Sequence, residues 1–206
     1  MTIHWGQLGA ALTDFSALPA PDADLTAWAK RIGTPDGAFP LIGAGTRAET
    51  YAALLWNGER CARAGLGPTA GLTLVGLAVG AEHGRSAAEL AAAVADGLAS
   101  DVVSAAPVST GVIAATVTAA RLAGVPDADL PALLDLAASL MVIGPPEAAP
   151  GHAPAAGWLA LRARSAGIVG MAGGLAHTLA VVAGDPAPLD RAPSDRDVRE
   201  ILGTLR

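Results

Sequence analysis

The chain has 206 residues, a formal net charge of −6 and 13 Lys and Arg side chains, which are scattered along the sequence. No basic stripe is therefore available to neutralise phosphates, which argues against nucleic-acid binding. The single cysteine excludes an internal disulfide and a cysteine-cluster metal site, and we expect neither a metal nor a cofactor.

Small side chains dominate the apolar part of the composition. Hydrophobic residues make up 52% of the chain and aromatic residues only 3%, and alanine is the most frequent of the hydrophobic residues. This favours closely packed helices over a β-sandwich, which needs β-branched and aromatic side chains. We therefore predict an all-α fold, a compact helical bundle. The opening stretch "MTIHWGQLGA" has no basic region followed by an apolar core, so we expect no signal peptide and a cytoplasmic location.

Capping residues and Gly/Pro breaks divide the chain into predicted elements. An irregular arm covers residues 1–23, a helical domain covers 24–186, and a linker with a C-terminal amphipathic helix covers 187–206. Two helices of the domain are expected to begin at capping boxes, Thr46-x-x-Glu49 and Ser86-x-x-Glu89. In chain order the pattern predicts helices over 24–32, 46–64, 69–83, 86–104, 110–122 and 131–143, an extended stretch over 39–42 and a mobile loop over 144–157.

An uncharged segment of 19 residues follows, from Ala166 to Gly184. Its length approaches that of a membrane span. Its Ala, Gly, Thr and His residues contribute little insertion energy, however, and no aromatic residues flank it. We therefore expect a buried helix here, with His177 as a hydrogen-bonded core residue.

Several blocks of the helical domain follow one another in an order that resembles a known family. The blocks are "FPLIGAGTRAETYAALLWNG", "GLTLVGLAVGAEHGRSAAELAAAVADGLASDV", "STGVIAATVTAARLAGVPDADLPALLDLAASL" and "ARSAGIVGMAGGLAHTLAVVAGD". Together they resemble the MmgE/PrpD family, which includes 2-methylcitrate dehydratase, cis-aconitate decarboxylase and iminodisuccinate epimerase. The resemblance covers about residues 38–186. It implies the helical domain of such enzymes without their second α/β domain and, because these domains pair face to face in the family, a homodimer.

The resemblance also implies that the family's acid and base residues are missing. Members of the family carry a histidine and three aspartates in a loop that corresponds to "NGERCARAGLGP" in this chain. The matching positions here are Ala62 for the histidine and Gly65, Gly67 and Pro68 for the aspartates. A second family histidine, a lysine and a third histidine correspond to Val108, Arg162 and Ser165. The set that would abstract a proton next to a carboxylate is therefore lost, and the scaffold remains.

Seven residues are candidates for a remodelled site. His152 lies in the predicted loop, where a lid could present it as a catalytic acid or base, and Arg162 could act in catalysis by binding an anion. Arg60 or Arg63 could clamp a substrate carboxylate. Two further substrate-binding candidates, Ser109 and Thr110, lie at the N-terminus of a predicted helix, which could hold an anion. The last candidate is Ser165, which is close to Arg162 in sequence.

Each candidate also has a purely structural interpretation. Arg60 and Arg63 would belong to a solvated helix face, and the two hydroxyl residues would be N-caps. A helical wheel places Cys61 in the core as an inert thiol, and Trp56 on the polar face, where a ligand or partner chain would cover it. His83 is expected to be an exposed residue at a helix C-terminus.

Three functions fit these observations. The first is a diverged lyase or isomerase that positions a small organic acid or a specialised metabolite. The second is a non-catalytic partner subunit, which lends its scaffold to a longer family member that retains the catalytic residues. The third is a cyclase that works by the shape of an apolar pocket. The expected partners are a second copy of the chain, a small-molecule substrate and, for the second function, a hetero-partner; neither nucleic acid nor a membrane is expected.

Overall fold

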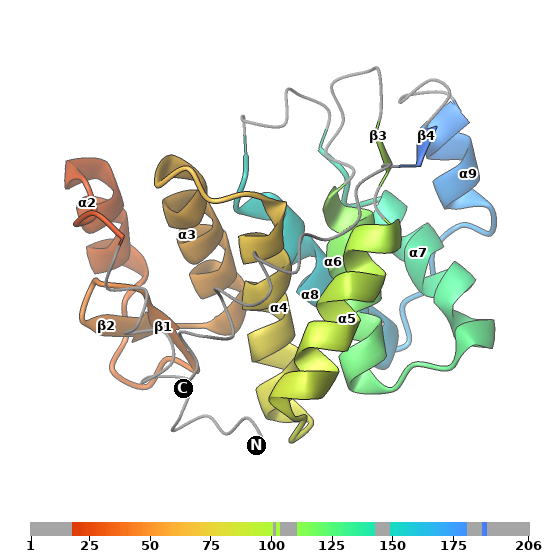
Figure 1. Cartoon of the computed structure of the whole chain (residues 1–206), viewed down its shortest axis with the longest axis horizontal. Helices are drawn as coiled ribbons and strands as arrows, with labels where there is room; N and C mark the ends of the chain where they lie inside the picture. Colours follow the sequence, from red (N-terminus) through yellow and green to blue (C-terminus); the bar gives the residue numbers. More distant parts are fainter. Residues whose placement is uncertain (1–17, 101, 104–110, 143–148, 181–186, 189–206) are drawn as a thin grey trace.

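The computed structural model describes residues 18–100, 102–103, 111–142, 149–180 and 187–188. Ser109 and Thr110, most of the predicted arm and the predicted C-terminal amphipathic helix lie outside these residues. The described part is mostly helical (Figure 1), as the composition predicts. Its helices lie side by side in a row that runs from α2 (Ala23–Ile32) at one end to α7 (Leu130–Ala138) and α9 (Gly174–Thr178) at the other.

Helix α2 begins where the sequence predicts, because Asp22 caps it. The Asp22 carboxylate accepts a hydrogen bond of 2.8 Å from the backbone N–H of Leu25, which satisfies one of the free donors of the first turn. Leu25 and Ala29 lie one turn apart and form the buried face of the helix. The helix ends at Ile32, in agreement with the predicted boundary, and Gly33 is its C-cap.

A small antiparallel hairpin follows, made of β1 (Phe39–Leu41) and β2 (Thr46–Ala48). Its turn contains Gly43 and Gly45 with φ values of 72° and 67°, a region that glycine occupies without strain. The expected extended stretch is confirmed. The expected capping box at Thr46 is wrong, because the turn glycines allow the chain to reverse and Thr46 pairs with β1 instead of starting a helix.

Helix α3 (Thr50–Arg63) begins directly after the hairpin, and no side-chain cap hydrogen bond starts it. Helix α4 (Pro68–Glu82) begins with a proline, whose missing N–H costs nothing in a first turn. Helix α5 (Ala87–Ser100) begins at the predicted capping box. Ser86 N–H donates to the Glu89 carboxylate at 2.7 Å, and Glu89 N–H donates to Ser86 Oγ at 3.2 Å.

Helix α6 (Gly111–Ala123) is the centre of the fold. It packs against α4, α5, α7 and α8 (His152–Ser165), and its residues 112–120 are all buried. Small residues allow this close approach: a Cβ added to Gly157 of α8 would lie 2.7 Å from the backbone carbon of Ala115. The alanine and glycine content thus serves helix packing, as the composition predicts.

Two later boundaries differ from the prediction. Helix α7 follows the 3₁₀ helix η2 (Asp127–Asp129) and ends at Ala138, earlier than expected. Helix α8 begins at His152, inside the region whose composition predicts a loop, because Pro154 is tolerated in a first helical turn. Beyond the helices, β3 (Val102–Val103) pairs antiparallel with β4 (Ala187–Pro188).

The expected long buried helix from Ala166 is wrong. The chain turns at Gly167 and Gly173, whose φ values are 84° and 73°, and among the described residues 166–180 only the five of α9 are α-helical. Gly170 touches the backbone of α7, since a Cβ there would lie 2.4 Å from Leu136 N. Glycine's freedom and low helix propensity explain the interruption. His177 is consequently exposed and is not a core residue. Among the described helices, none combines the length and the apolar character that crossing a membrane requires.

Candidate functional site

Trp56 and Arg60 lie in the interior, so their placement on a solvated face was wrong. Trp56 is fully buried and its Nε1–H donates to the carbonyl of Leu25 at 2.9 Å, while Arg60 is only 5% exposed. A helical wheel assumes one buried face, whereas α3 contacts α2, the hairpin, α4 and α8 and is covered on several sides. Trp56 therefore needs no ligand or partner chain to cover it.

Arg60 joins three parts of the fold. Its Nη2 donates to the carbonyl of Pro19 at 2.8 Å, and its guanidinium lies over the Trp56 ring, 5.9 Å from the centroid. It also adjoins the hairpin turn, where a Cβ on Gly43 would lie 3.0 Å from Nη2. Its Nε is buried without a hydrogen-bond partner. Desolvation lowers the pKa of this guanidinium, because burial disfavours the charged form.

Arg63 lies on the surface, in a cluster of charges. Its Nε donates to Glu59 and its Nη1 donates to Asp22, each at 2.8 Å. These hydrogen bonds raise the pKa of Arg63, and the pKa of Asp22 is lowered by the Leu25 N–H and by Arg63. The solvated-face interpretation is confirmed for Arg63. Its charge is already paired, which leaves less of it for a substrate carboxylate.

Cys61 is a core residue, as the sequence predicts. It is 2% exposed, and burial raises the pKa of its thiol to about 11. The Arg60 charge opposes this shift only partly. A thiol that stays protonated at neutral pH is a poor nucleophile.

Asn57 is an important buried residue that the sequence analysis missed. Its Oδ1 accepts from Ile42 N–H at 2.8 Å and its Nδ2 donates to the carbonyl of Pro40 at 2.9 Å, which fixes the hairpin to α3. Beside it, a Cβ on Gly58 would lie 2.6 Å from Gly151 at the start of α8. An Asn-Gly pair in the middle of a helix was the available signal. Its role here is packing, since both residues are buried.

His152 and Ser165 stand at the two ends of α8 and both contact backbone carbonyls. His152 Nε2 lies 2.5 Å from the carbonyl oxygen of Leu140. Ser165 Oγ donates to the carbonyl of Leu161 at 2.9 Å. His152 is half-buried in the first turn of a helix, so the structure does not place it on a loop that could act as a lid.

Arg162 lines a wide cavity of about 530 Å³ together with Ala38, Glu82 and His83. Its guanidinium lies 5.3 Å from the centroid of the Trp158 ring and 3.6 Å from the Glu82 carboxylate. His83 is exposed at the C-terminus of α4, as expected. The Arg162 side chain is 52% exposed, so water screens its charge.

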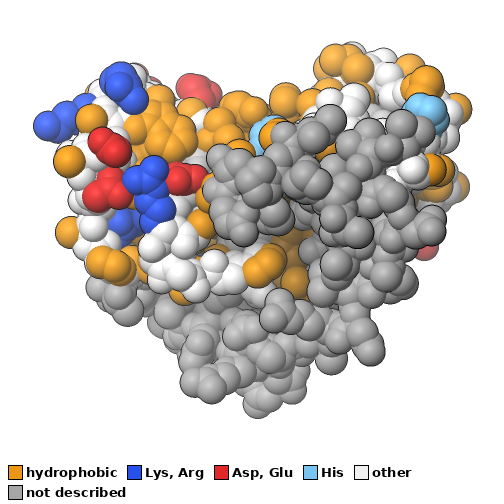
Figure 2. Space-filling view, turned by 90° about the horizontal axis from the view of Figure 1, so that it is seen from above, with side chains coloured by type: hydrophobic (Ala, Val, Ile, Leu, Met, Phe, Trp, Pro, Cys, Tyr) orange, Lys and Arg blue, Asp and Glu red, His pale blue; other side chains and the backbone are white. Residues whose placement is uncertain are grey.

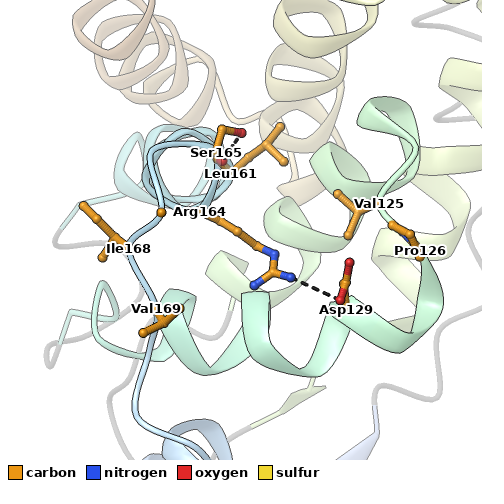
Figure 3. A pocket seen from close by; sticks show the side chains of 9 residues that line it. Val125, Pro126, Asp129, Leu161, Arg164, Ser165, Ile168 and Val169 are labelled. Carbon is orange, nitrogen blue, oxygen red and sulfur yellow. Dashed lines mark hydrogen bonds and ion pairs between the residues drawn. The ribbon is translucent and has the colours of Figure 1, made fainter.

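Arg164 points to the opposite side of α8 from Arg162, because residues two positions apart in a helix are rotated by about 200° around its axis. It enters a second cavity, of about 420 Å³, where its Nη2 lies 3.2 Å from Asp129 Oδ1 (Figure 3). We call this the Arg164 cavity. The lining residues come from α8, from the segment after it and from the turn before α7: Val125, Pro126, Asp129, Leu161, Arg164, Ser165, Gly167, Ile168 and Val169.

The walls of the Arg164 cavity are mostly apolar. Figure 3 shows Val125 and Pro126 on one side, Ile168 and Val169 on the other, and the Arg164 side chain between them. Arg164 is 27% exposed and Asp129 is 50% exposed. Such a partly exposed ion pair contributes about 0–1 kcal/mol, so another anion can replace Asp129 at little cost.

The structure does not assemble the predicted residues into one site. Ser165 lines the Arg164 cavity and Arg162 lines the cavity beside Glu82 and His83, while Arg60, Arg63 and His152 line neither. In the described ranges, no group of three or more His, Cys, Asp or Glu side chains could hold a metal ion. No local sequence pattern indicates the pair of Arg164 and Asp129, since their approach depends on how α8 packs beside the turn before α7.

Comparisons with models of protein families, with curated proteins and with solved structures find no match to this chain.

Proposed function

We propose that this protein binds a small organic acid with an apolar body in the Arg164 cavity. The observation that carries the proposal is a partly buried arginine between apolar walls. Among the described lining residues, the only carboxylate is that of the weakly paired Asp129. Binding sites for small molecules combine mainly apolar walls with few polar groups in this way, and a volume of about 420 Å³ suits a small ligand.

The proposed pose follows from the chemistry of the walls. The ligand carboxylate replaces Asp129 at the Arg164 guanidinium, whose fork of N–H donors matches a carboxylate. The apolar body lies between Val125 and Ile168, where each buried CH₂ contributes about 0.8 kcal/mol. Arg162 cannot take part, because it faces the other cavity.

Binding is supported better than catalysis. Arginine stays protonated and cannot act as a base. Ser165 already donates to a backbone carbonyl, which leaves the Asp129 carboxylate as the candidate acid or base among the described lining residues. If the protein is a lyase, isomerase or cyclase, as the MmgE/PrpD resemblance suggests for small organic acids, Asp129 is therefore its acid or base.

Titration calorimetry with straight-chain carboxylates tests the proposal. We expect butanoate, hexanoate and octanoate to bind with affinity that rises about fourfold per added CH₂ until the cavity is filled. Octanol should bind much more weakly than octanoate, because it lacks the charge that Arg164 recognises.

Three substitutions locate the site. Arg164→Gln should lose about tenfold or more in octanoate affinity, which is the loss of one charge-assisted contact. Arg162→Gln is the matched control on the same helical turn and should bind like the wild type. Asp129→Asn should bind octanoate more tightly, since it removes the competing carboxylate. No octanoate binding by the wild type, or equal losses in both arginine variants, would contradict the proposal.

A further inference from the structure

Arg162 and Glu82 form a loose ion pair in the cavity of about 530 Å³ that both of them line. Arg162 Nη1 and Glu82 Oε2 are 3.6 Å apart, whereas every other ion pair among the described residues is 3.2 Å or shorter. Figure 2 shows the contrasting case, charged side chains gathered over α2 and α3, where Arg63 bonds Asp22 and Glu59 at 2.8 Å each. Arg162 and Glu82 attract each other without closing a hydrogen bond.

The Glu82 carboxylate lacks a hydrogen-bonded cation. Its side chain is only 18% exposed, and no residue that the structure describes donates a hydrogen bond to it. Glu82 is also the last residue of α4, where the partial negative charge of the helix end disfavours a carboxylate. A cation that donates a hydrogen bond to this carboxylate would therefore be bound favourably.

The Arg162 guanidinium is held in place and open to an anion. It lies 5.3 Å from the centroid of the Trp158 ring, one helical turn earlier on α8. Within the described part of the chain, no group accepts a hydrogen bond from it. Its fork of N–H donors is therefore free to bind a carboxylate. One cavity thus offers an open cation and an open anion side by side.

Ligands with a single charge suit this cavity poorly. A simple anion at Arg162 would be repelled by Glu82, and a simple amine at Glu82 would be repelled by Arg162. A ligand with one charge of each sign avoids both repulsions. Because the two side chains are only 3.6 Å apart, the two charges of the ligand must also lie close together.

We infer that an α-amino acid binds in the cavity lined by Ala38, Glu82, His83 and Arg162, which we call the Arg162 cavity. The ammonium group donates to Glu82 and the carboxylate accepts from Arg162. Both groups of an α-amino acid are attached to the same carbon atom, which gives the required close spacing. The volume leaves room for the ligand's side chain beside Ala38. The inference does not rest on the proposed ligand of the Arg164 cavity.

Titration calorimetry with L-norleucine and three related compounds tests the inference. Hexanoate lacks the ammonium group of norleucine, pentylamine lacks the carboxylate, and 6-aminohexanoate is an isomer with the two charges at opposite ends. We expect norleucine to bind about tenfold or more tightly than each of the three. The titrations use the full chain carrying Arg164→Gln, so that carboxylates do not bind in the Arg164 cavity.

Three further substitutions in that chain locate the site. Glu82→Gln should bind norleucine no more tightly than hexanoate, because the ammonium group loses its anionic partner. Arg162→Gln should bind norleucine no more tightly than pentylamine, because the carboxylate loses its cationic partner. Glu59→Gln is the matched control: it also removes one negative charge, but Glu59 lines neither cavity, so norleucine affinity should not change.

Four results would each overturn the inference: no norleucine binding, equal binding of norleucine and hexanoate, equal binding of norleucine and 6-aminohexanoate, or equal losses in Glu82→Gln and Glu59→Gln. Circular dichroism should show native helix content in all variants, since neither Glu82 nor Arg162 makes a hydrogen bond within the described residues. Octanoate binding by the wild type is measured separately. Its failure would contradict the proposed function alone, and failure of norleucine binding would contradict this inference alone.

Discussion

Arg60 and Cys61 are neighbours in the last turns of α3, and burial shifts both toward their neutral forms. Desolvation lowers the pKa of the guanidinium and raises that of the thiol to about 11. The arginine keeps its charge at neutral pH and is compensated by the Pro19 carbonyl and the Trp56 ring. Neither residue lines a described cavity, so their role is to hold the interior of the N-terminal half together.

The thiol of Cys61 makes stability depend on alkaline pH. Its usual pKa is 9.0 and its folded value is about 11, so the unfolded chain releases this proton first as pH rises. The contribution of the protonated thiol to the free energy of unfolding is therefore fully present below about pH 9. It is lost between about pH 9 and pH 11, at about 1.4 kcal/mol per pH unit. Urea titrations across this range should show a shallower decline of unfolding free energy for Cys61→Ala. Parallel declines for the two proteins would contradict the assignment.

The sequence predicted individual residues well where one face of a helix decides the outcome, and poorly elsewhere. Cys61 and Arg63 lie where the helical wheel places them. Trp56 and Arg60 do not, because the hairpin folds back onto the polar side of α3 and α2 covers it. That contact depends on the β-turn at Gly43 and Gly45, which the capping-box interpretation of Thr46 concealed.

At the scale of elements, local signals were sufficient for the helices that carry their own start signals. Asp22, Pro68 and the Ser86–Glu89 box each begin a helix within one residue of the predicted position. The segment after Ser165 lacked such a signal, and hydropathy alone suggested a helix. Its structure is set by contacts that are distant in sequence, above all the Asp135 carboxylate. No local pattern predicts those contacts.

Glycines at close helix contacts should tolerate substitution poorly, whereas helical glycines with space around them should tolerate it well. Gly157→Ala should lower the free energy of unfolding by about 1–3 kcal/mol, because the new methyl group would overlap the α6 backbone at Ala115. Gly71→Ala is the matched control in α4: its nearest atom would be Pro154 Cδ at 3.6 Å, so the gain in helix propensity should leave stability equal or higher. Thermal unfolding of both variants tests this, and equal destabilisation would contradict it.

At the scale of the whole molecule, stability should decrease from α6 outward. Four helices surround α6, whereas α2 contacts mainly α3, and α9 contacts mainly α7. Hydrogen exchange followed by mass spectrometry should show the slowest exchange in α6, which opens only with global unfolding. The amides of α2 and α9 should exchange sooner, through local opening. Protection in α9 equal to that in α6 would contradict this order.

The mostly helical class followed from composition, but the arrangement of the helices did not. A high alanine and glycine content indicates that helices pack closely, but it does not indicate which helices pack against each other. The Arg164 cavity shows the same limit. Its arginine and its aspartate lie on different elements, and only the packing of α8 beside α7 brings them within 3.2 Å.

The position of α8 between α3 and α6 also bears on how the chain is made. A ribosome releases α3 through α7 before residues 152–165, yet α8 fills the space that those helices leave. Gly151 and Gly157 allow it to enter closely, against the backbones of Leu55 and Ala115. During synthesis, the apolar faces of α3 and α6 therefore stay uncovered until α8 emerges. That interval is when a nascent chain of this protein would most need a chaperone.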